Sequence, residues 1–254
     1  MTAPDTTTHV SDRNGRREGD LSYVSLAAPD PARAEAFYGR LFGWNFAPGQ
    51  YGREQGLEVI PQVGIYDGRQ PAGNVVRGAV LSYRVDDITV ALERVRAAGG
   101  RATDAEQRAY GLESLVTDDQ GIEFYLHQLA DASESDGPDL SNGRQHGDVA
   151  YVTIGVRDLP RAERFYGSVL GWTFRPGSHP NGRQIDGVTP MSGMSQGDRI
   201  GAQLSYRVDD IAAAVRLIQE LGGTADRVDE RPYGLAVDNC TDDQGVEFGL
   251  LQLG

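Results

Sequence analysis

The sequence contains two copies of one unit, and this internal repeat constrains the fold more than any other feature. Three pairs of segments carry the repeat: PARAEAFYGRLFGWNF (31–46) with LPRAERFYGSVLGWTF (159–174), LSYRVDDI (81–88) with an identical segment at 204–211, and TDDQG (117–121) with an identical segment at 241–245. A period this long indicates a duplicated domain rather than a solenoid of short repeats. The chain of 254 residues is long enough for each copy to bury its own core.

The repeat sets the predicted domain boundaries. We predict a first copy at residues 21–130 and a second copy at 148–254. Residues 1–20 are polar and lack hydrophobic periodicity, which predicts a disordered tail. Residues 131–147 are rich in Ser, Asp, Gly and Asn, which is typical of a linker.

Each copy shows the same order of predicted elements. In the first copy, a half-buried strand at 23–28 precedes a helix that Asp30 caps, that Pro31 opens and that Gly43 ends. The remaining predicted elements are a strand at 79–85, a helix from Asp86-Asp87 to Gly99-Gly100, and strands at 112–117 and 122–128. Strands that follow each helix in this way predict an α+β fold with a sheet curled around a pocket.

The composition excludes several classes of function. The chain has 24 basic and 37 acidic residues, a net charge of −13, which disfavours nucleic acid and anionic membranes as partners. All the basic residues are arginines, so a Schiff-base lysine and a P-loop lysine are excluded. The single cysteine, Cys240, excludes an internal disulfide and a CxxC zinc site. With no apolar run that could span a membrane, we expect a cytoplasmic protein.

The motifs of both copies resemble those of the glyoxalase/bleomycin-resistance/dioxygenase superfamily, also called vicinal oxygen chelate. The resemblance rests on D-x-x-R-A-x-x-F-Y-G-x-x-x-G-W followed by V-D-D-I, G-G, Y-G and D-D-Q-G, in that order. It implies tandem domains of paired βαβββ modules, two modules forming each cup-shaped mixed sheet, with a ligand inside the cup. Members of the superfamily include lyases, isomerases, extradiol dioxygenases, transferases that modify fosfomycin, and drug-binding proteins without catalysis, so the fold does not decide the function.

The resemblance also implies where a metal would be held in such a cup. The positions that match the family's metal ligands are Tyr23, Val80 and Tyr125 in the first copy, and Tyr151, Gln203 and Gly249 in the second. Valine and glycine side chains cannot coordinate a divalent ion, and neutral phenols are poor substitutes for imidazole and carboxylate. We therefore expect no metal and no other cofactor. A ligand set shifted to Glu123, His127 or Glu247 would restore a metal-dependent lyase or dioxygenase.

If the matched positions face the cup, strand alternation defines the candidate site residues. The candidate acid/base residues are Glu123, Tyr125 and His127 in the closing strand of the first copy. The candidate ligand-binding residues from the two cups are Tyr23, Ser25, Tyr151, Thr153, Gln203 and Glu247. His127 lies near a strand end, where a solvated histidine is the simpler interpretation, and no Ser-His-Asp or Cys-His arrangement is evident in the sequence.

Four further residues are candidates for ligand binding. Arg84 and Arg207 precede the V-D-D motif in each copy, where each could anchor a ligand carboxylate or form an ion pair with Asp86 or Asp209. Tyr51 and Tyr66 lie in the stretch 47–80, which differs between the copies and could therefore set specificity.

We interpret the chain as a metal-independent protein that binds a small, partly aromatic molecule and isomerises, cyclises or eliminates it by acid/base chemistry. The absence of lysine and the abundance of arginine, alanine and glycine are typical of a GC-rich bacterial genome, where secondary metabolism is a fitting context. The alternative is a protein that sequesters an antibiotic or metabolite without turnover. Because the duplication supplies two halves in one chain, we expect a monomer.

Overall fold

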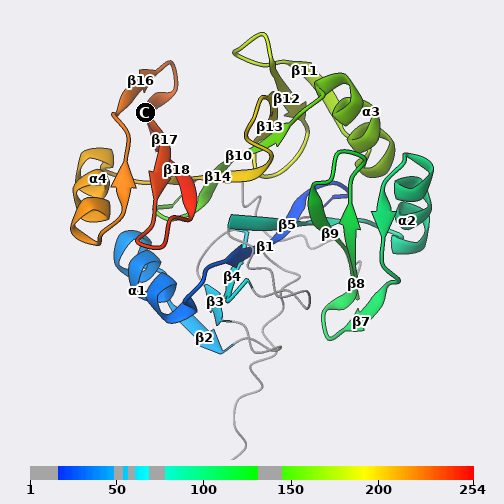
Figure 1. Cartoon of the computed structure of the whole chain (residues 1–254), viewed down its shortest axis with the longest axis horizontal. Helices are drawn as coiled ribbons and strands as arrows, with labels where there is room; N and C mark the ends of the chain where they lie inside the picture. The colour runs from blue at the N-terminus through cyan, green and yellow to red at the C-terminus, as the bar shows by residue number, and fades with distance from the viewer. Residues whose placement is uncertain (1–16, 49–53, 57–60, 69–77, 131–144) are drawn as a thin grey trace, which may run out of the picture.

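The computed structural model describes residues 17–48, 54–56, 61–68, 78–130 and 145–254. The elements of the first copy are β1 (Leu21–Ala27), α1 (Pro31–Phe42), β2 (Phe46–Pro48), β3 (Glu54–Gly56), β4 (Val63–Tyr66), β5 (Gly78–Arg84), α2 (Ile88–Ala97), β6 (Arg101–Ala102), β7 (Glu106–Arg108), β8 (Gly111–Thr117) and β9 (Glu123–Leu129). The second copy repeats this order, which confirms the predicted α+β class and the repeat (Figure 1).

The elements of the second copy are β10 (Val149–Val156), α3 (Leu159–Leu170), β11 (Thr173–Pro176), β12 (Gly182–Asp186), β13 (Ser192–Gln196), β14 (Gly201–Arg207), α4 (Ile211–Glu220), β15 (Thr224–Ala225), β16 (Asp229–Arg231), β17 (Gly234–Thr241) and β18 (Glu247–Leu253). Among the described residues, no helix combines the length and the apolar composition required to cross a membrane.

Each cup is built within one copy. In the first copy, β1 pairs in parallel with β4 and antiparallel with β5, and β5 pairs in parallel with β9, so the sheet passes from one βαβββ module into the next without a break. The second copy has the same pairings between β10, β13, β14 and β18. Among the described residues, an antiparallel bridge between Ala79 of β5 and Ala202 of β14 joins the two sheets. The sequence alone had left open whether cups form within or between copies.

The local chemistry of the first helix explains where it begins and ends. The Asp30 carboxylate accepts hydrogen bonds from the backbone N–H groups of Ala32 and Arg33, and Pro31 occupies the first turn, where no N–H partner is needed. Gly43 ends the helix in the left-handed conformation with φ 71°, which a residue with a side chain rarely adopts. The predicted caps of α1 are thus confirmed.

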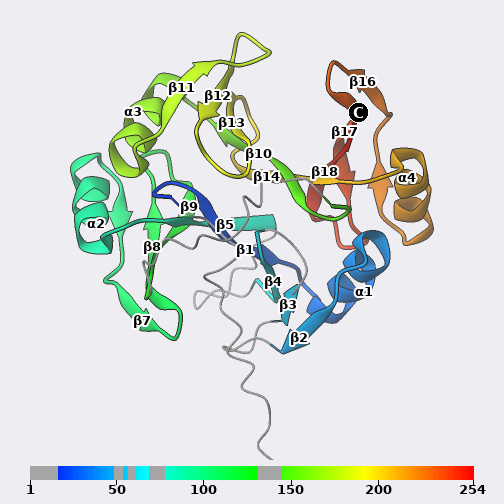
Figure 2. The same cartoon turned by 180° about the vertical axis from the view of Figure 1, so that it is seen from behind.

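The two copies interlock through a reciprocal interface. The Tyr38 hydroxyl of α1 donates to Asp242 at 3.3 Å, and the Tyr166 hydroxyl of α3 donates to Asp118 at 3.0 Å. Each of these aspartates also accepts two backbone N–H bonds within its own D-D-Q-G turn. Burial raises the pKa of both carboxyl groups, although these hydrogen bonds oppose the shift. Helix α1 accordingly lies beside α4, and α2 beside α3 (Figure 2).

The segments before each copy belong to this interface. The indole N–H of Trp172 donates to the carbonyl of Gly19, and that of Trp44 donates to the carbonyl of Gly147. Residues 17–20 and 145–147, at the ends of the predicted tail and linker, form hydrogen bonds with the folded copies. The matched tryptophans are buried packing residues.

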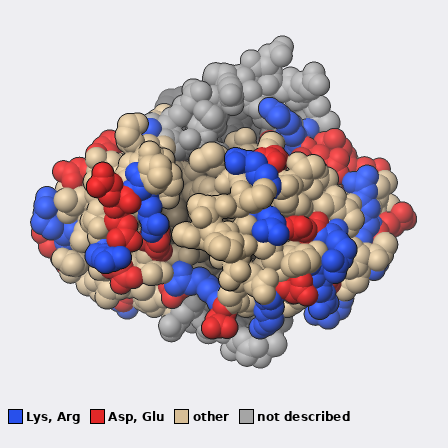
Figure 3. Space-filling view, turned by 90° about the horizontal axis from the view of Figure 1, so that it is seen from above, with Lys and Arg blue, Asp and Glu red and all other residues tan. Residues whose placement is uncertain are grey.

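The charged side chains are mixed on the face of the molecule that is seen from above. Figure 3 shows arginines interspersed with aspartates and glutamates on this face, so neither sign forms a continuous patch there.

Candidate functional site

The cup of the first copy presents two tyrosines across its central strands. Tyr23 of β1 lies opposite Ser82 of β5, and Ser82 lies opposite Tyr125 of β9. Both tyrosines are half-buried, whereas Ser82 is buried. The residue between the tyrosines is therefore Ser82, whereas Val80 pairs with Ser25 one step along the strands.

A buried hydrogen-bonded network lies next to these tyrosines. His127, which is 3% exposed, contacts the Ser22 hydroxyl through Nδ1 at 3.1 Å and the Glu113 carboxylate through Nε2 at 3.1 Å. The same carboxylate oxygen accepts from the Tyr110 hydroxyl at 2.6 Å, and its other oxygen accepts from Arg108 Nε at 2.9 Å. We call these five residues the His127 network. They come from β1, β7, β8, β9 and the turn at Tyr110.

Electrostatics keep the carboxylate of this network ionised. Burial alone would raise the pKa of Glu113. Hydrogen bonds from His127 and Tyr110, the charge of His127 and the bond from Arg108 together lower this pKa from 4.5 to about 2. Glu113 therefore holds a negative charge beside the imidazole across the physiological pH range.

The network corrects two sequence-based interpretations. The expectation that His127 is solvated is wrong, because β8, Ser22 and the Tyr110 ring, with its centroid 5.2 Å from that of His127, enclose the imidazole. A Ser-His-carboxylate arrangement also exists, although the sequence shows none. Its members lie 105 and 14 residues from His127, and only the strand pairing brings them together. A β-bulge between Leu21 and Tyr23 allows Ser22 to reach it.

The second copy replaces the centre of this network with apolar side chains. At the positions of Ser22, Glu113 and His127 it has Ala150, Ala236 and Leu251, which form a small apolar cluster of their own. Tyr233 at the position of Tyr110 is 53% exposed, because no carboxylate is there to hold its hydroxyl.

The second cup has other polar residues at its matched positions. The Tyr151 hydroxyl donates to the side-chain carbonyl of Gln184 at 3.1 Å, and burial followed by the nearby Tyr233 raises the pKa of Tyr151. Thr153 is half-buried and lies opposite Gln203. Gln203 and Glu247 contact Arg199 at one end of the cup.

Several predicted residues lie apart from the His127 network. Glu123 is exposed at the start of β9, Tyr66 ends β4 opposite Ala27, and Ser25 is buried in β1. Tyr51 lies outside the described residues.

The two arginines before the V-D-D motif lie near matched aspartates but face different strand neighbours, because Arg84 lies opposite His127 of β9 and Arg207 opposite Leu251 of β18. Arg84 lies 3.8 Å from the carboxylate of Asp86, and Arg207 lies 3.9 Å from that of Asp209. The repetition of this loose ion pair in two dissimilar cups favours a structural role over ligand anchoring.

The residues at the matched metal positions do not fit a divalent ion. The strand register brings Tyr23, Ser82 and Tyr125 together in one cup, and Tyr151, Ser205 and Gly249 in the other. Neither set contains an imidazole or a carboxylate, which are the usual protein ligands of zinc, iron and manganese. Across the part of the chain that the structure describes, no three His, Cys, Asp or Glu side chains are grouped to hold a metal.

Comparison with known proteins agrees with the fold. The sequence model of the glyoxalase-like domain matches residues 23–127 and again residues 151–251. No curated protein sequence matches the chain.

Several solved structures share the architecture at low identity. They include the 2,3-dioxygenase LapB from Pseudomonas sp. KL28 (13% identity, TM-score 0.63, 96% of this chain and 94% of that chain). The Mn(II)-bound glyoxalase from Novosphingobium aromaticivorans is also similar (12% identity, TM-score 0.66, 92% and 82% coverage). A mutant of 4-hydroxymandelate synthase from Streptomyces coelicolor has 14% identity, a TM-score of 0.59 and 94% and 93% coverage. At these identities the likeness shows the fold alone.

Proposed function

From the premise that this chain belongs to the family of glyoxalase-like domains, we propose that its first cup binds a small, partly aromatic molecule and transfers a proton to or from it without a metal ion. The buried His127 network carries this proposal. The second copy folds with Ala150, Ala236 and Leu251 at the same positions, so the fold does not require the polar side chains. A buried ionic network without a structural need supports a chemical role.

The hydrogen bonds allow His127 to hold one proton or two. The Ser22 hydroxyl lies 2.9 Å from the carbonyl oxygen of Ser82 and 3.1 Å from Nδ1 of His127, and it has a single proton to donate. When it donates to Ser82, Nδ1 must donate to Ser22 while Nε2 donates to Glu113, so the imidazole carries two protons. When it rotates toward Nδ1, the imidazole carries one. Both arrangements keep the heavy atoms of Ser22, His127 and Glu113 where they are.

The proton reaches a bound molecule through the half-buried side of the network. Glu113 Oε2 accepts from both His127 and Tyr110. Tyr110 is half-buried, so part of its phenol ring is exposed to solvent. We assign His127 as the proton reservoir, Glu113 as the relay and Tyr110 as the group nearest the molecule. In this assignment Tyr110 gives its hydroxyl proton to the molecule, and its oxygen then takes a proton that His127 releases through Glu113; the reverse order removes a proton from the molecule. Tyr23 and Tyr125 offer aromatic faces to it, and Glu123 lies at the exposed end of the same strand face.

A second candidate is binding without turnover. The deep burial of Ser22 and His127, 1% and 3% exposed, favours it because a fixed network can position a ligand without exchanging protons. Turnover distinguishes the two: a sequestering protein returns its ligand unchanged.

The experiment compares the protein with its Ser22→Ala/Glu113→Ala/His127→Leu variant, which carries the sequence of the second copy at these positions. A library of phenols and aromatic acids is screened by thermal shift. Each compound that binds is then incubated with the protein, and mass spectrometry shows whether it has been converted.

Elemental mass spectrometry of protein purified without chelator should find well below one equivalent of transition metal. We expect hits that the triple variant no longer binds or converts. Retained conversion by the triple variant, or stoichiometric metal that survives dialysis, would contradict the proposal.

We also propose that the chain is a monomer, because the two copies already cover each other's interface. Light scattering should give about the chain mass of 27.5 kDa. A mass near twice that value would contradict it.

A further inference from the structure

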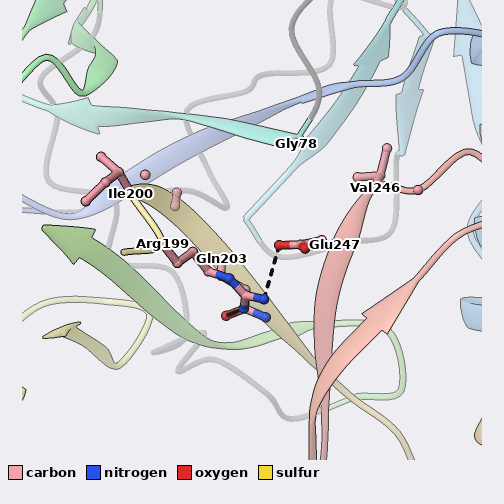
Figure 4. A pocket seen from close by; sticks show the side chains of 9 residues that line it. Gly78, Arg199, Ile200, Gln203, Val246 and Glu247 are labelled. Carbon is pink, nitrogen blue, oxygen red and sulfur yellow. Dashed lines mark hydrogen bonds and ion pairs between the residues drawn. The ribbon is translucent and has the colours of Figure 1, made fainter. Parts of the chain in front are cut away.

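A pocket lies where the two copies meet, and no residue of the His127 network lines it (Figure 4). It encloses about 230 Å³ between Gly78 of β5, residues 199–203 at the start of β14 and residues 245–247 at the start of β18. We call it the junction pocket. Gly78 and Gly201 border open space at this pocket, since a Cβ atom at either position would meet nothing within 4 Å.

Three polar side chains line this pocket, those of Arg199, Gln203 and Glu247. The guanidinium of Arg199 donates to the Gln203 side-chain carbonyl at 2.7 Å and to the Asn239 side-chain carbonyl at 3.0 Å. It also lies 3.3 Å from the Glu247 carboxylate, the contact that Figure 4 marks. The amide of Gln203 donates to the backbone carbonyl of Asp238 at 2.7 Å, which fixes its carbonyl toward Arg199. The pocket thus presents one positive and one negative group.

This polar set is particular to the second copy. The register of β17 and β18 shifts between Val237 and Cys240, because β17 carries one more residue than β8 does. The resulting bulge supplies both Asn239 and the Asp238 carbonyl to the set, and bulges commonly serve to redirect groups toward sites. In the first copy, Val80 occupies the position of Gln203 and has no amide to contribute.

The size and charge of the junction pocket define its ligand. A volume of 230 Å³ holds about eight water molecules at ~30 Å³ each, which is below the usual size of sites for drug-sized ligands. The Arg199 and Glu247 side chains are 45% and 56% exposed, and an exposed ion pair is worth only about 0–1 kcal/mol, so a ligand can open it. A simple anion would be repelled by Glu247 and by the net charge of −13, and a simple cation by Arg199.

We propose that the junction pocket binds a small zwitterion that carries a carboxylate and an ammonium group on the same carbon, as a free α-amino acid does. The carboxylate pairs with Arg199, and the ammonium group pairs with Glu247 and the Gln203 carbonyl. Such a molecule replaces each half of the ion pair and leaves neither charge uncompensated.

The test is a titration of the full chain with L-alanine, followed by two-dimensional ¹H–¹⁵N NMR. Propionate, which lacks the ammonium group, and ethylamine, which lacks the carboxylate, are matched probes. We expect saturable shifts around residues 199–203 and 245–247 with L-alanine and far weaker binding of both probes. Arg199→Met and Glu247→Gln should each weaken L-alanine binding by about tenfold or more. Glu123→Gln, at the matched position of the first copy, should leave the affinity unchanged.

Absence of saturable L-alanine binding, equal binding of propionate, or binding that survives Arg199→Met and Glu247→Gln would overturn the proposal. The Ser22→Ala/Glu113→Ala/His127→Leu variant should bind L-alanine as the parent chain does. The proposal for the junction pocket and the proposal for the first cup are therefore tested independently.

Discussion

The cups of the two copies contain opposite kinds of side chain at three matched positions, although the order of helices and strands is the same. The first cup has a serine, a glutamate and a histidine in one buried hydrogen-bonded network, and the second has two alanines and a leucine in one apolar cluster. Helix caps, strand order and the interface contacts repeat in both copies. The fold therefore accommodates either polar or apolar side chains at these positions, and the polar side chains of the first cup serve something other than folding.

The buried polar side chains of the first cup can destabilise the fold if one of them is removed, whereas the apolar side chains of the second cup leave no polar group unpaired. Each member of the His127 network is satisfied by another member, and the removal of one leaves a buried polar group without its partner. An apolar replacement of the whole set removes that risk, and such replacements are often neutral or stabilising. The effects of single and complete replacements should therefore differ in sign or in size.

The largest effect is expected when Glu113 alone is removed. Glu113→Ala leaves His127, Tyr110 and Arg108 without their common acceptor and should lower the free energy of unfolding by about 3–5 kcal/mol. The Ser22→Ala/Glu113→Ala/His127→Leu variant should return to within about 1 kcal/mol of the parent. Urea unfolding followed by tryptophan fluorescence measures both. A triple variant less stable than Glu113→Ala would show that the first copy needs the network to fold.

Acid should weaken the first cup through Glu113. Its pKa in the folded chain, about 2, lies below the ordinary 4.5, so its ionised form stabilises the folded state above pH 4.5 and this contribution is lost as the pH falls from 4.5 to 2. The stability advantage of the parent over Glu113→Gln should shrink across this window. Urea unfolding of both proteins at a series of pH values measures this difference. The buried Asp118 and Asp242 are present in both proteins, so their titration cancels in the comparison. An advantage that stays constant down to pH 2 would contradict the lowered pKa.

A smaller effect should separate the matched tyrosines Tyr110 and Tyr233. Tyr110→Phe removes a 2.6 Å hydrogen bond to the ionised Glu113 and should cost about 1.5–3 kcal/mol of stability. Tyr233 is 53% exposed, so Tyr233→Phe should change stability by less than about 0.5 kcal/mol. Equal losses in the two variants would mean that the hydroxyl contact with Glu113 contributes nothing.

The sequence predicted the features that depend on neighbours along the chain. The caps of α1, Asp30 and Gly43, follow from local backbone chemistry, and the duplication follows from the repeated segments. The strands at 79–85 and 112–117 follow from their apolar patterns, and the structure places them at β5 and β8 within one residue.

The site could be predicted only in part, because it depends on the register between strands. His127 and the face that it shares with Tyr125 follow from alternation, but Glu113 joins it through the pairing of β8 with β9. Ser22 reaches His127 only through a bulge that breaks the alternation of β1. One signal was available: at the matched positions, the serine, glutamate and histidine of one copy stand against alanine, alanine and leucine in the other.

The smallest differences are expected at the interface, where the copies agree. Tyr38→Phe and Tyr166→Phe each remove one hydroxyl donor to a buried aspartate, Asp242 or Asp118, and each should cost about 1 kcal/mol. Because each aspartate keeps its two backbone donors, the losses should match within about 0.5 kcal/mol and add in the double variant. Urea unfolding of the three variants measures this. A loss at one tyrosine several times that at the other would show that the interface has diverged between the copies as the cups have.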